Sequence, residues 1–98
     1  MEKRKPHYSL SLAQSRIAEG RFRVTQVARA GAADMGFDEA GLLGVVTALD
    51  RGAFYKSMTS HADHTVWQDV YRPMTQRGQV YIKLTLQDDL LIVSFKER

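Results

Sequence analysis

Polar and apolar residues alternate along the C-terminal half of the chain, from Phe54 onward. Four segments there have the alternation and the residue types of β-strands: FYKSMTS from Phe54, TVWQDVYRP from Thr65, QVYIKLTLQ from Gln79 and LLIVSFKE from Leu90. The dipeptides Arg77-Gly78 and Asp88-Asp89 separate the later segments and are typical of hairpin turns. This half therefore predicts antiparallel strands.

The N-terminal half instead carries helix signals. Ser11 and Gln14 have the spacing of a capping box, and Gly20 is placed to end the short helix that this box begins. The flanking segments HYSL (7–10) and RFRV (21–24) have extended character, and HYSL is a candidate edge strand. One helix between two extended segments is therefore expected before residue 25.

Two further helices are predicted before the strands begin. Thr25 is placed to cap the second helix, which Gly36 ends, and Asp38 can cap the third. The third helix carries an apolar stripe formed by Leu42, Leu43, Val46 and Leu49. Helices first and strands later predict an α+β fold, with an antiparallel β-sheet packed on N-terminal helices. At 98 residues and 44% hydrophobic content, residues 1–98 are expected to form a single domain.

The last two strands can be paired from their pattern. If Asp88-Asp89 forms a two-residue loop, three apolar pairs face each other: Leu86 with Leu91, Leu84 with Val93, and Ile82 with Phe95. These pairs are expected to pack on the helices. The same register places Tyr81 opposite Lys96 and Lys83 opposite Ser94, so a phenol and several amines share the second face.

Other strands add polar groups to this second face. Lys56 is flanked by Phe54 and Met58 at strand spacing, and Gln68 is in phase with Arg72. Such a face suits a flexible phosphodiester, because cations hold phosphates while flat or soft apolar groups stack on bases. Lysine and tyrosine are also common on a solvated strand face, so a surface without chemistry is the alternative interpretation.

The remaining side chains of the second strand are expected to face the helices. Trp67 and Tyr71 alternate with Gln68, which places Asp69 between them on the buried side. A buried carboxylate needs partners. Either Asp69 pairs with a basic group, such as an arginine of the helical half, or the strand contains a bulge.

Charge and cysteine content narrow the possible functions. The formal charge of +3 permits a polyanionic partner, although acidic and basic residues interleave. The chain has no cysteine, which excludes disulfides and thiolate metal sites and suits the reducing cytoplasm. No apolar run approaches the roughly 20 residues of a membrane helix, and MEKRKPHYSL lacks the hydrophobic region of an export signal. The basic run at residues 3–5 is interpreted as a solvated tail or an RNA contact.

The histidines after the first strand form a weak metal motif. His61 and His64 flank Asp63, but the further ligands that a metal site needs are not evident, so no metal is expected. His64 is instead a candidate to assist proton transfer, with a loop or capping role as the alternative.

Five segments of the chain closely resemble the MqsR family when taken in order: MEKRKPHY, FYKSMT, DHTVWQDVYRP, GQVYIK and LIVSFK. Members of this family are mRNA-cleaving toxins of bacterial toxin–antitoxin modules, with a RelE-like fold. The resemblance implies a cytoplasmic endoribonuclease that needs no metal or cofactor and cuts mRNA at short sites beginning with GC, commonly GCU. It also implies a cognate antitoxin, an MqsA-like protein that binds zinc and DNA, with promoter DNA contacted only through the antitoxin complex.

The resemblance also implies which residues act. The active-site residues proposed for the family map onto Lys56, Gln68, Tyr81 and Lys96. The expected reaction is attack of a ribose 2′-OH on the neighbouring phosphate, which yields a 2′,3′-cyclic phosphate and a 5′-hydroxyl. Lys56 and Lys96 are expected to neutralise phosphate charge, Tyr81 to transfer a proton, and Gln68 to orient phosphate or base. Which group is the general base stays open.

The surrounding residues are expected to assist this chemistry. RNA contacts are predicted for four side chains: Phe54, Met58, Arg72 and Lys83. Clustering of lysines with a tyrosine is expected to lower their pKa values toward neutrality. Two other functions fit the same pattern, namely a non-catalytic RNA-binding module and a protein-interaction domain that pairs an exposed strand, HYSL or the one at Phe54, with a partner.

Overall fold

The computed structural model describes every residue from 1 to 98 and contains three helices. They are α1 (Leu10–Ala18), α2 (Gln26–Asp34) and α3 (Glu39–Thr47). The predicted caps Thr25 and Asp38 are confirmed, since their side chains accept bonds from Ala28 N at 3.0 Å and Gly41 N at 2.8 Å. Gly36 follows α2 with φ +88°, a conformation that favours glycine.

The capping box predicted for α1 is wrong. Ser9, two residues earlier than predicted, accepts the bond from Leu12 N at 3.2 Å. Gln14 turns away from its own helix and donates to three carbonyl oxygens at the end of α3, those of Val46, Thr47 and Leu49, at 3.3, 2.9 and 2.8 Å. The amide of Gln14 therefore satisfies orphan carbonyls of α3 and joins two helices.

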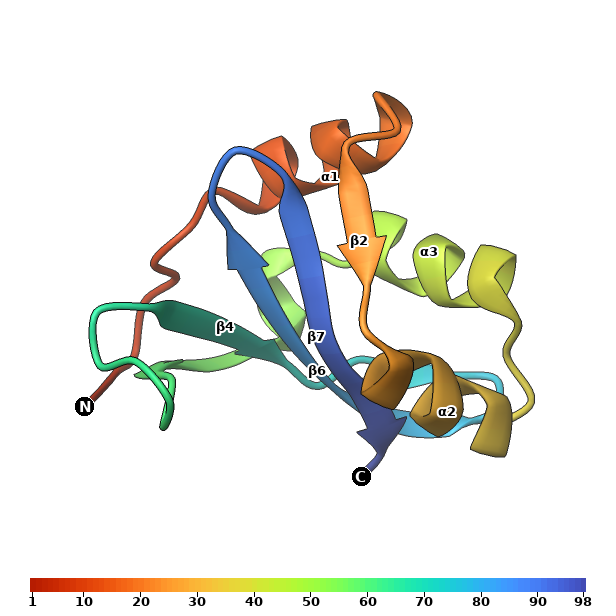
Figure 1. Ribbon diagram of the computed structural model, residues 1–98. Coiled ribbons are helices and arrows are strands. Elements are labelled where there is room, and N and C mark those ends of the chain that lie inside the picture. The colour runs from red at the N-terminus through yellow and green to blue at the C-terminus, as the bar shows by residue number, and fades with distance from the viewer.

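The strands form one sheet, with α1 near one end of β7 and α2 near the other (Figure 1). They are β1 (Glu2–Lys3), β2 (Phe22–Val24), β3 (Phe54–Thr59), β4 (Trp67–Tyr71), β5 (Met74–Thr75), β6 (Gly78–Leu86) and β7 (Leu90–Glu97), with a short 3₁₀ turn, η1 (Arg51–Ala53), before β3. Their order is β1-β3-β4-β6-β7-β2, and β5 pairs with the beginning of β6. All pairs are antiparallel except β2 with β7. The predicted α+β fold, with an antiparallel sheet packed on N-terminal helices, is confirmed.

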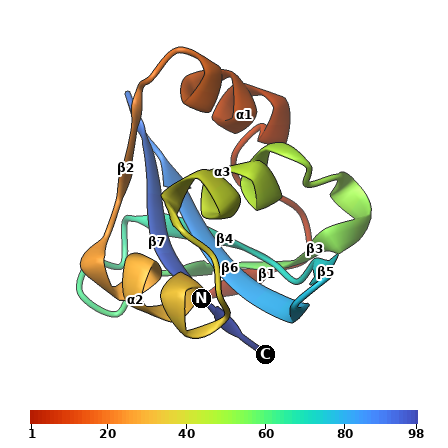
Figure 2. The same cartoon turned by 90° about the vertical axis from the view of Figure 1, so that its right-hand side faces the viewer.

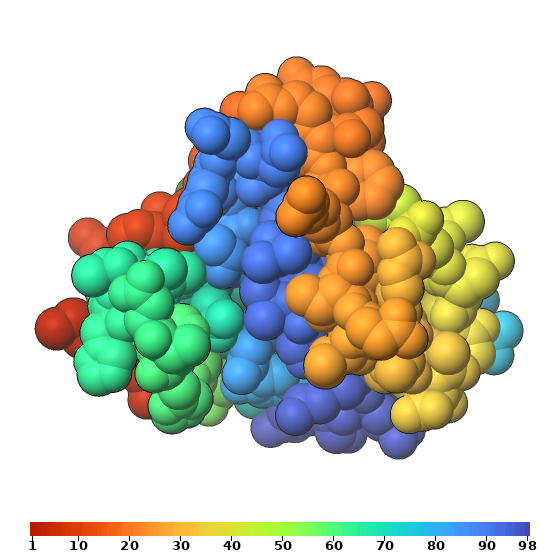
Figure 3. Space-filling model, in the orientation of Figure 1, coloured from red at the N-terminus to blue at the C-terminus, as the bar shows by residue number.

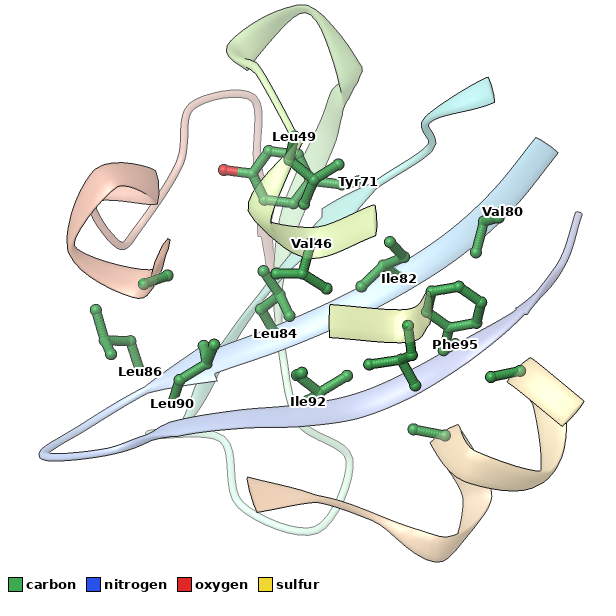
Figure 4. Packing of buried hydrophobic residues seen from close by; sticks show 14 residues of the cluster. Val46, Leu49, Tyr71, Val80, Ile82, Leu84, Leu86, Leu90, Ile92 and Phe95 are labelled. Carbon is green, nitrogen blue, oxygen red and sulfur yellow. The ribbon is translucent and has the colours of Figure 1, made fainter. Parts of the chain in front are cut away.

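The helices cover only one face of this sheet (Figure 2). The apolar side chains of β6 and β7 point into the space between the sheet and the helices, where Val46 and Leu49 meet them (Figure 4). α2 lies so close to β7 that a Cβ at Gly31 would collide with the carbonyl oxygen of Phe95. We call the other side of β3, β4, β6 and β7 the open face. None of the helices has the length and apolar character needed to cross a membrane.

The β6–β7 register agrees with the prediction over only part of the hairpin. Tyr81 lies opposite Lys96 and Lys83 opposite Ser94, as predicted. Beyond Lys83 the register shifts by one residue, so Leu84 faces Ile92 and Leu86 faces Leu90. The loop is thus three residues, 87–89, rather than Asp88-Asp89 alone. The apolar side chains that fill the core on β7 are therefore Leu90 and Ile92, both fully buried.

The consequence of this shift is that two apolar side chains leave the core. Leu91 and Val93, which the two-residue loop would place against the helices, lie partly exposed on the open face. A β-bulge is the physical cause, because the extra residue on one strand reverses which side chains face inward.

Asp69 is the most deeply buried carboxylate and is 1% exposed. It accepts hydrogen bonds from the backbone N–H groups of His7 and Tyr8, at 3.0 and 2.9 Å, and from Ser57 Oγ at 2.6 Å. Neither predicted solution, an arginine partner or a bulge at this position, occurs. HYSL is also not a strand, because its first two N–H groups bind this carboxylate rather than a sheet edge.

Residues 1–8, which we call the N-terminal arm, run along the edge of the sheet, where β1 pairs with β3. Tyr71 packs in the core as predicted, but Trp67 meets the arm rather than a helix. The His7 ring stacks on Trp67 with 5.2 Å between centroids, and Lys3 Nζ lies 4.2 Å from the same ring centroid. The basic start of the chain is therefore only partly a solvated tail, since Lys3 belongs to β1.

Candidate active site

A bulge in β3 decides which side chains reach the open face at this strand. The pairing of β3 with β4 shifts between Phe54 and Lys56. Phe54 lies opposite Tyr71 and packs edge-on against it, with 5.5 Å between ring centroids, on the core side. The prediction that Phe54 shares a face with Lys56 is therefore wrong. Tyr55 takes that place, and alternation could not reveal it because a bulge breaks the period of two.

Lys56 begins a row of side chains that crosses the open face, and we call it the lysine row. Its register partner on β4 is Val70, which pairs with Lys83 on β6, which in turn pairs with Ser94 on β7. Lys56 and Lys83 are therefore two strands apart, on either side of the buried Val70. Neighbouring strands are separated by about 4.8 Å.

Tyr81 lies beside this row, because it is two residues from Lys83 on β6 and so shares its face. It is paired with Lys96 of β7. The Lys96 amine is 5.8 Å from the centroid of the Tyr81 ring. Tyr55 reaches the same place from β3, with 6.3 Å between its ring centroid and that of Tyr81. Three of the predicted active-site residues, Lys56, Tyr81 and Lys96, are therefore brought together from three strands.

Gln68 lies on the open face farther along β4. It pairs with Met58 of β3 and stands two residues from Val70, which corresponds to about 7 Å along the strand. Arg72 follows the other end of β4, and its guanidinium carbon lies 3.6 Å from the Tyr55 ring centroid. The open face thus presents cations and aromatic rings around Tyr55 and an amide with a thioether beyond them.

The three lysines of the open face differ in their electrostatics. Partial burial, followed by the charges of Lys96 and Lys56, lowers the pKa of Lys83. A hydrogen bond from its amine to the Glu2 carboxylate, at 2.9 Å, instead raises the pKa of Lys56. The expectation that clustering lowers the pKa of the active-site lysines is therefore wrong for Lys56, because the bond to its acidic partner outweighs the cost of desolvation.

Glu2 is a residue of this site that the sequence pattern does not reveal. β1 pairs with β3 so that Glu2 lies opposite Met58, and its carboxylate is 60% exposed. The bond to Lys56 lowers the pKa of Glu2, so the pair is fully ionised near neutrality. A phosphate that binds Lys56 must compete with this carboxylate.

The loop between β3 and β4 contains two of the three histidines. His61 and His64 are both exposed, and Asp63 uses its carboxylate to accept bonds from the backbone and hydroxyl of Thr65 at 2.9 and 2.6 Å. No group of three or more potential metal-ligating side chains occurs in the chain. Assistance by His64 in proton transfer stays a prediction.

Comparison with known proteins places this geometry in a family. The model of the family described as "Motility quorum-sensing regulator, toxin of MqsA" matches residues 5–97. The chain is also 49% identical, over 98 residues and the full length of both proteins, to the mRNA interferase toxin MqsR of Escherichia coli (strain K12). The α+β architecture agrees with the RelE-like fold that the sequence motifs imply.

Proposed function

Because this chain belongs to the MqsR family of toxins, we propose that it is an endoribonuclease that cleaves messenger RNA and so arrests translation and growth. The observation that carries the proposal is the meeting of Lys56, Tyr81 and Lys96 on the face that the helices leave open. A relative identical at about half of its positions is named an mRNA interferase toxin.

The proposed reaction is the attack of a ribose 2′-OH on the adjacent phosphorus, with departure of the 5′-oxygen of the next nucleotide. A 2′,3′-cyclic phosphate and a 5′-hydroxyl result. The cations of Lys56 and Lys96 neutralise the negative charge that develops on the phosphorane oxygens. Stabilisation of such charge in the transition state is usually the largest single contribution to catalysis. These side chains supply positive charge without a metal ion.

Proton transfer is assigned to the groups beside the phosphate site. Tyr81 lies between Tyr55 and Lys96, where its hydroxyl can exchange a proton with the reacting oxygens. Lys83 is a second candidate, since its lowered pKa makes the neutral amine more available than that of an ordinary lysine. Gln68 carries no charge and is assigned to orienting phosphate or base.

The partners follow from the same family. The substrate is single-stranded mRNA at short sites that begin with GC, such as GCU. A cognate antitoxin of the MqsA type neutralises the toxin in a protein complex, and the family description, a toxin of MqsA, supports this partner. Promoter DNA is reached only through that complex.

Cleavage of a defined RNA in the presence of a chelator tests the proposal. The purified wild-type protein is expected to cut a GCU-containing RNA in EDTA. Lys56→Met, Lys96→Met and Tyr81→Phe are each expected to reduce kcat by about 10²- to 10³-fold while thermal unfolding is retained.

Arg51→Gln is the matched control, because it also removes one exposed positive charge but lies in η1, among residues packed near α1. It is expected to cleave at the wild-type rate. RNA that is bound and retarded but left intact would instead show a non-catalytic RNA-binding module.

A further inference from the structure

Next to the lysine row, the open face contains a hollow of about 240 Å³. It lies between the loop after β3 and the β6–β7 hairpin, which stand apart on this side of the molecule (Figure 3). Its lining includes Gln68 of β4, Thr85 of β6, Gln87 and Asp89 of the hairpin loop, and Leu91 and Val93 of β7. We propose that this hollow receives a nucleobase adjacent to the scissile phosphate and reads its edge. The inference rests on the proposed ribonuclease function.

The floor of the hollow is apolar because of the bulge after Lys83. That bulge turns Leu91 and Val93 from the core to the open face, where both are partly exposed. Beside them Thr85 is buried, and its hydroxyl donates to the carbonyl of Trp67 at 3.0 Å. An apolar floor of this kind favours the apolar face of a base over a hydrated ion.

The rim offers two uncommitted amides. The side chains of Gln68 and Gln87 line the hollow, and neither amide group is held by another protein group. An amide presents a donor and an acceptor side by side, which is the pattern needed to pair with the edge of an unstacked base. Gln68 also borders the lysine row, so the two parts of the open face are continuous.

Charge favours a base over a phosphate in this position. The lining contains one charged side chain, Asp89, and its carboxylate is held by Arg21 at 2.9 Å. Phosphates would instead seek the lysine row, where Lys83 lies near the charges of Lys56 and Lys96. The separation of about 7 Å along β4 from Val70 to Gln68 is comparable with that between a phosphate and the base beside it. A phosphate site next to a slot whose one charged side chain is already paired is the arrangement that one nucleotide requires.

Replacement of Gln87 tests the assignment without touching the residues assigned to catalysis. A set of RNAs would differ only in the bases flanking the cleavage site and would include one abasic substrate for each flanking position. Gln87→Ala is expected to reduce discrimination among bases at one flanking position by about tenfold in kcat/KM. On the substrate that is abasic at that position, the variant and the wild type are expected to cleave at equal rates.

Gln76→Ala is the matched control, since Gln76 is also exposed but borders a groove on the helix side of the molecule. It is expected to keep the wild-type base preference. Leu91→Phe provides a second variant, because the larger ring fills the hollow. It is expected to lower kcat/KM on intact RNA to the value for the abasic substrate while circular dichroism and Tm show a folded protein.

Unchanged base preference in both Gln87→Ala and Leu91→Phe would overturn the assignment and leave the ribonuclease proposal standing. The same would hold if these variants lost only the binding of a protein partner. Absence of cleavage by the wild type would overturn the ribonuclease function and, with it, the base site.

Discussion

The lysines of the open face have different surroundings, and each amine is suited to a different task. Lys56 keeps its charge because its amine is bonded to Glu2, so it suits the permanent neutralisation of phosphate. Lys83 is partly buried among like charges, which favours its neutral form. Lys96 stands exposed near the end of β7, where it meets Tyr81. A single surface thus contains one lysine whose charged form is favoured by an acidic partner and one whose charged form is disfavoured by burial.

Lys83→Met is expected to stabilise the protein at neutral pH and to reduce its activity. The pKa of Lys83 is lower in the folded protein than in the unfolded chain, so its charge opposes folding at every pH below the lowered value. That penalty is relieved as the pH rises through the lowered pKa toward the ordinary value. The Tm gain of the variant, a few degrees at pH 7, is therefore expected to shrink in alkaline buffer. Thermal unfolding across pH measures it, and a lower Tm at pH 7 would contradict this assignment.

Glu2→Gln is expected to strengthen RNA binding. The carboxylate competes with phosphate for the Lys56 amine, and because exposed ion pairs of this kind are weak, its removal is expected to lower Kd by no more than about fivefold. Binding of an RNA with 2′-O-methyl groups, which cannot be cleaved, gives the Kd directly. Glu19→Gln is the control, because it breaks the Arg16–Glu19 pair on α1 and is expected to leave the Kd unchanged. Weaker binding by Glu2→Gln would show that this carboxylate positions Lys56 rather than competing for it.

At the scale of elements, two β-bulges determine the site. One exchanges Phe54 for Tyr55 on the open face, and the other brings Leu91 to it. The alternation of polar and apolar residues located the strands and the pairing of Tyr81 with Lys96, because those residues keep the period of two. It could not locate the bulges, since Leu90 and Leu91 are equally apolar and either can fill the core.

Contacts between residues far apart in the chain were the other feature that the sequence could not predict. The caps Thr25 and Asp38 are local signals and were predictable, because each acts on an N–H three residues away. The bonds from His7 and Tyr8 to Asp69 span more than 60 residues and depend on the completed fold. For the same reason the Glu2–Lys56 pair could not be predicted.

Gly44→Ala in α3 is expected to increase stability by about 0.5–1 kcal/mol, because glycine weakens a helix interior. A Cβ at Gly44 meets nothing within 4 Å. Gly36→Ala is the contrasting variant, since φ +88° and the nearby Arg77 side chain make a Cβ unfavourable there. Denaturant unfolding measures both, and equal effects of the two substitutions would contradict the helix boundaries described here.

Across the whole molecule, the N-terminal arm joins the core to the open face. Asp69 holds the arm from the core side, and Glu2, at the start of the arm, reaches Lys56 on the other side. Trp67 is covered by His7 and Lys3 of the same segment. Detachment of the arm would therefore affect both the stability of the fold and the charge around Lys56.

Asp69→Ala is expected to destabilise the protein by about 2–4 kcal/mol, because it leaves two part-buried N–H groups and the buried Ser57 hydroxyl without their acceptor. Hydrogen exchange of the His7 and Tyr8 amides is expected to become faster than that of β6. Asp63→Ala, at an exposed loop carboxylate, is the control and is expected to change neither quantity. Protected arm amides in Asp69→Ala would show that other contacts hold the arm.

The most direct measurement of the central claim removes one oxygen atom from the substrate. A GCU-containing RNA with a single 2′-deoxyribose at the cleavage position would be incubated in EDTA beside the all-ribose RNA, and the products would be identified by mass spectrometry. We expect the all-ribose RNA to give a 2′,3′-cyclic phosphate and a 5′-hydroxyl, and the substituted RNA to remain intact at that position. Cleavage of the 2′-deoxy substrate at an equal rate would contradict attack by the 2′-hydroxyl on the open face.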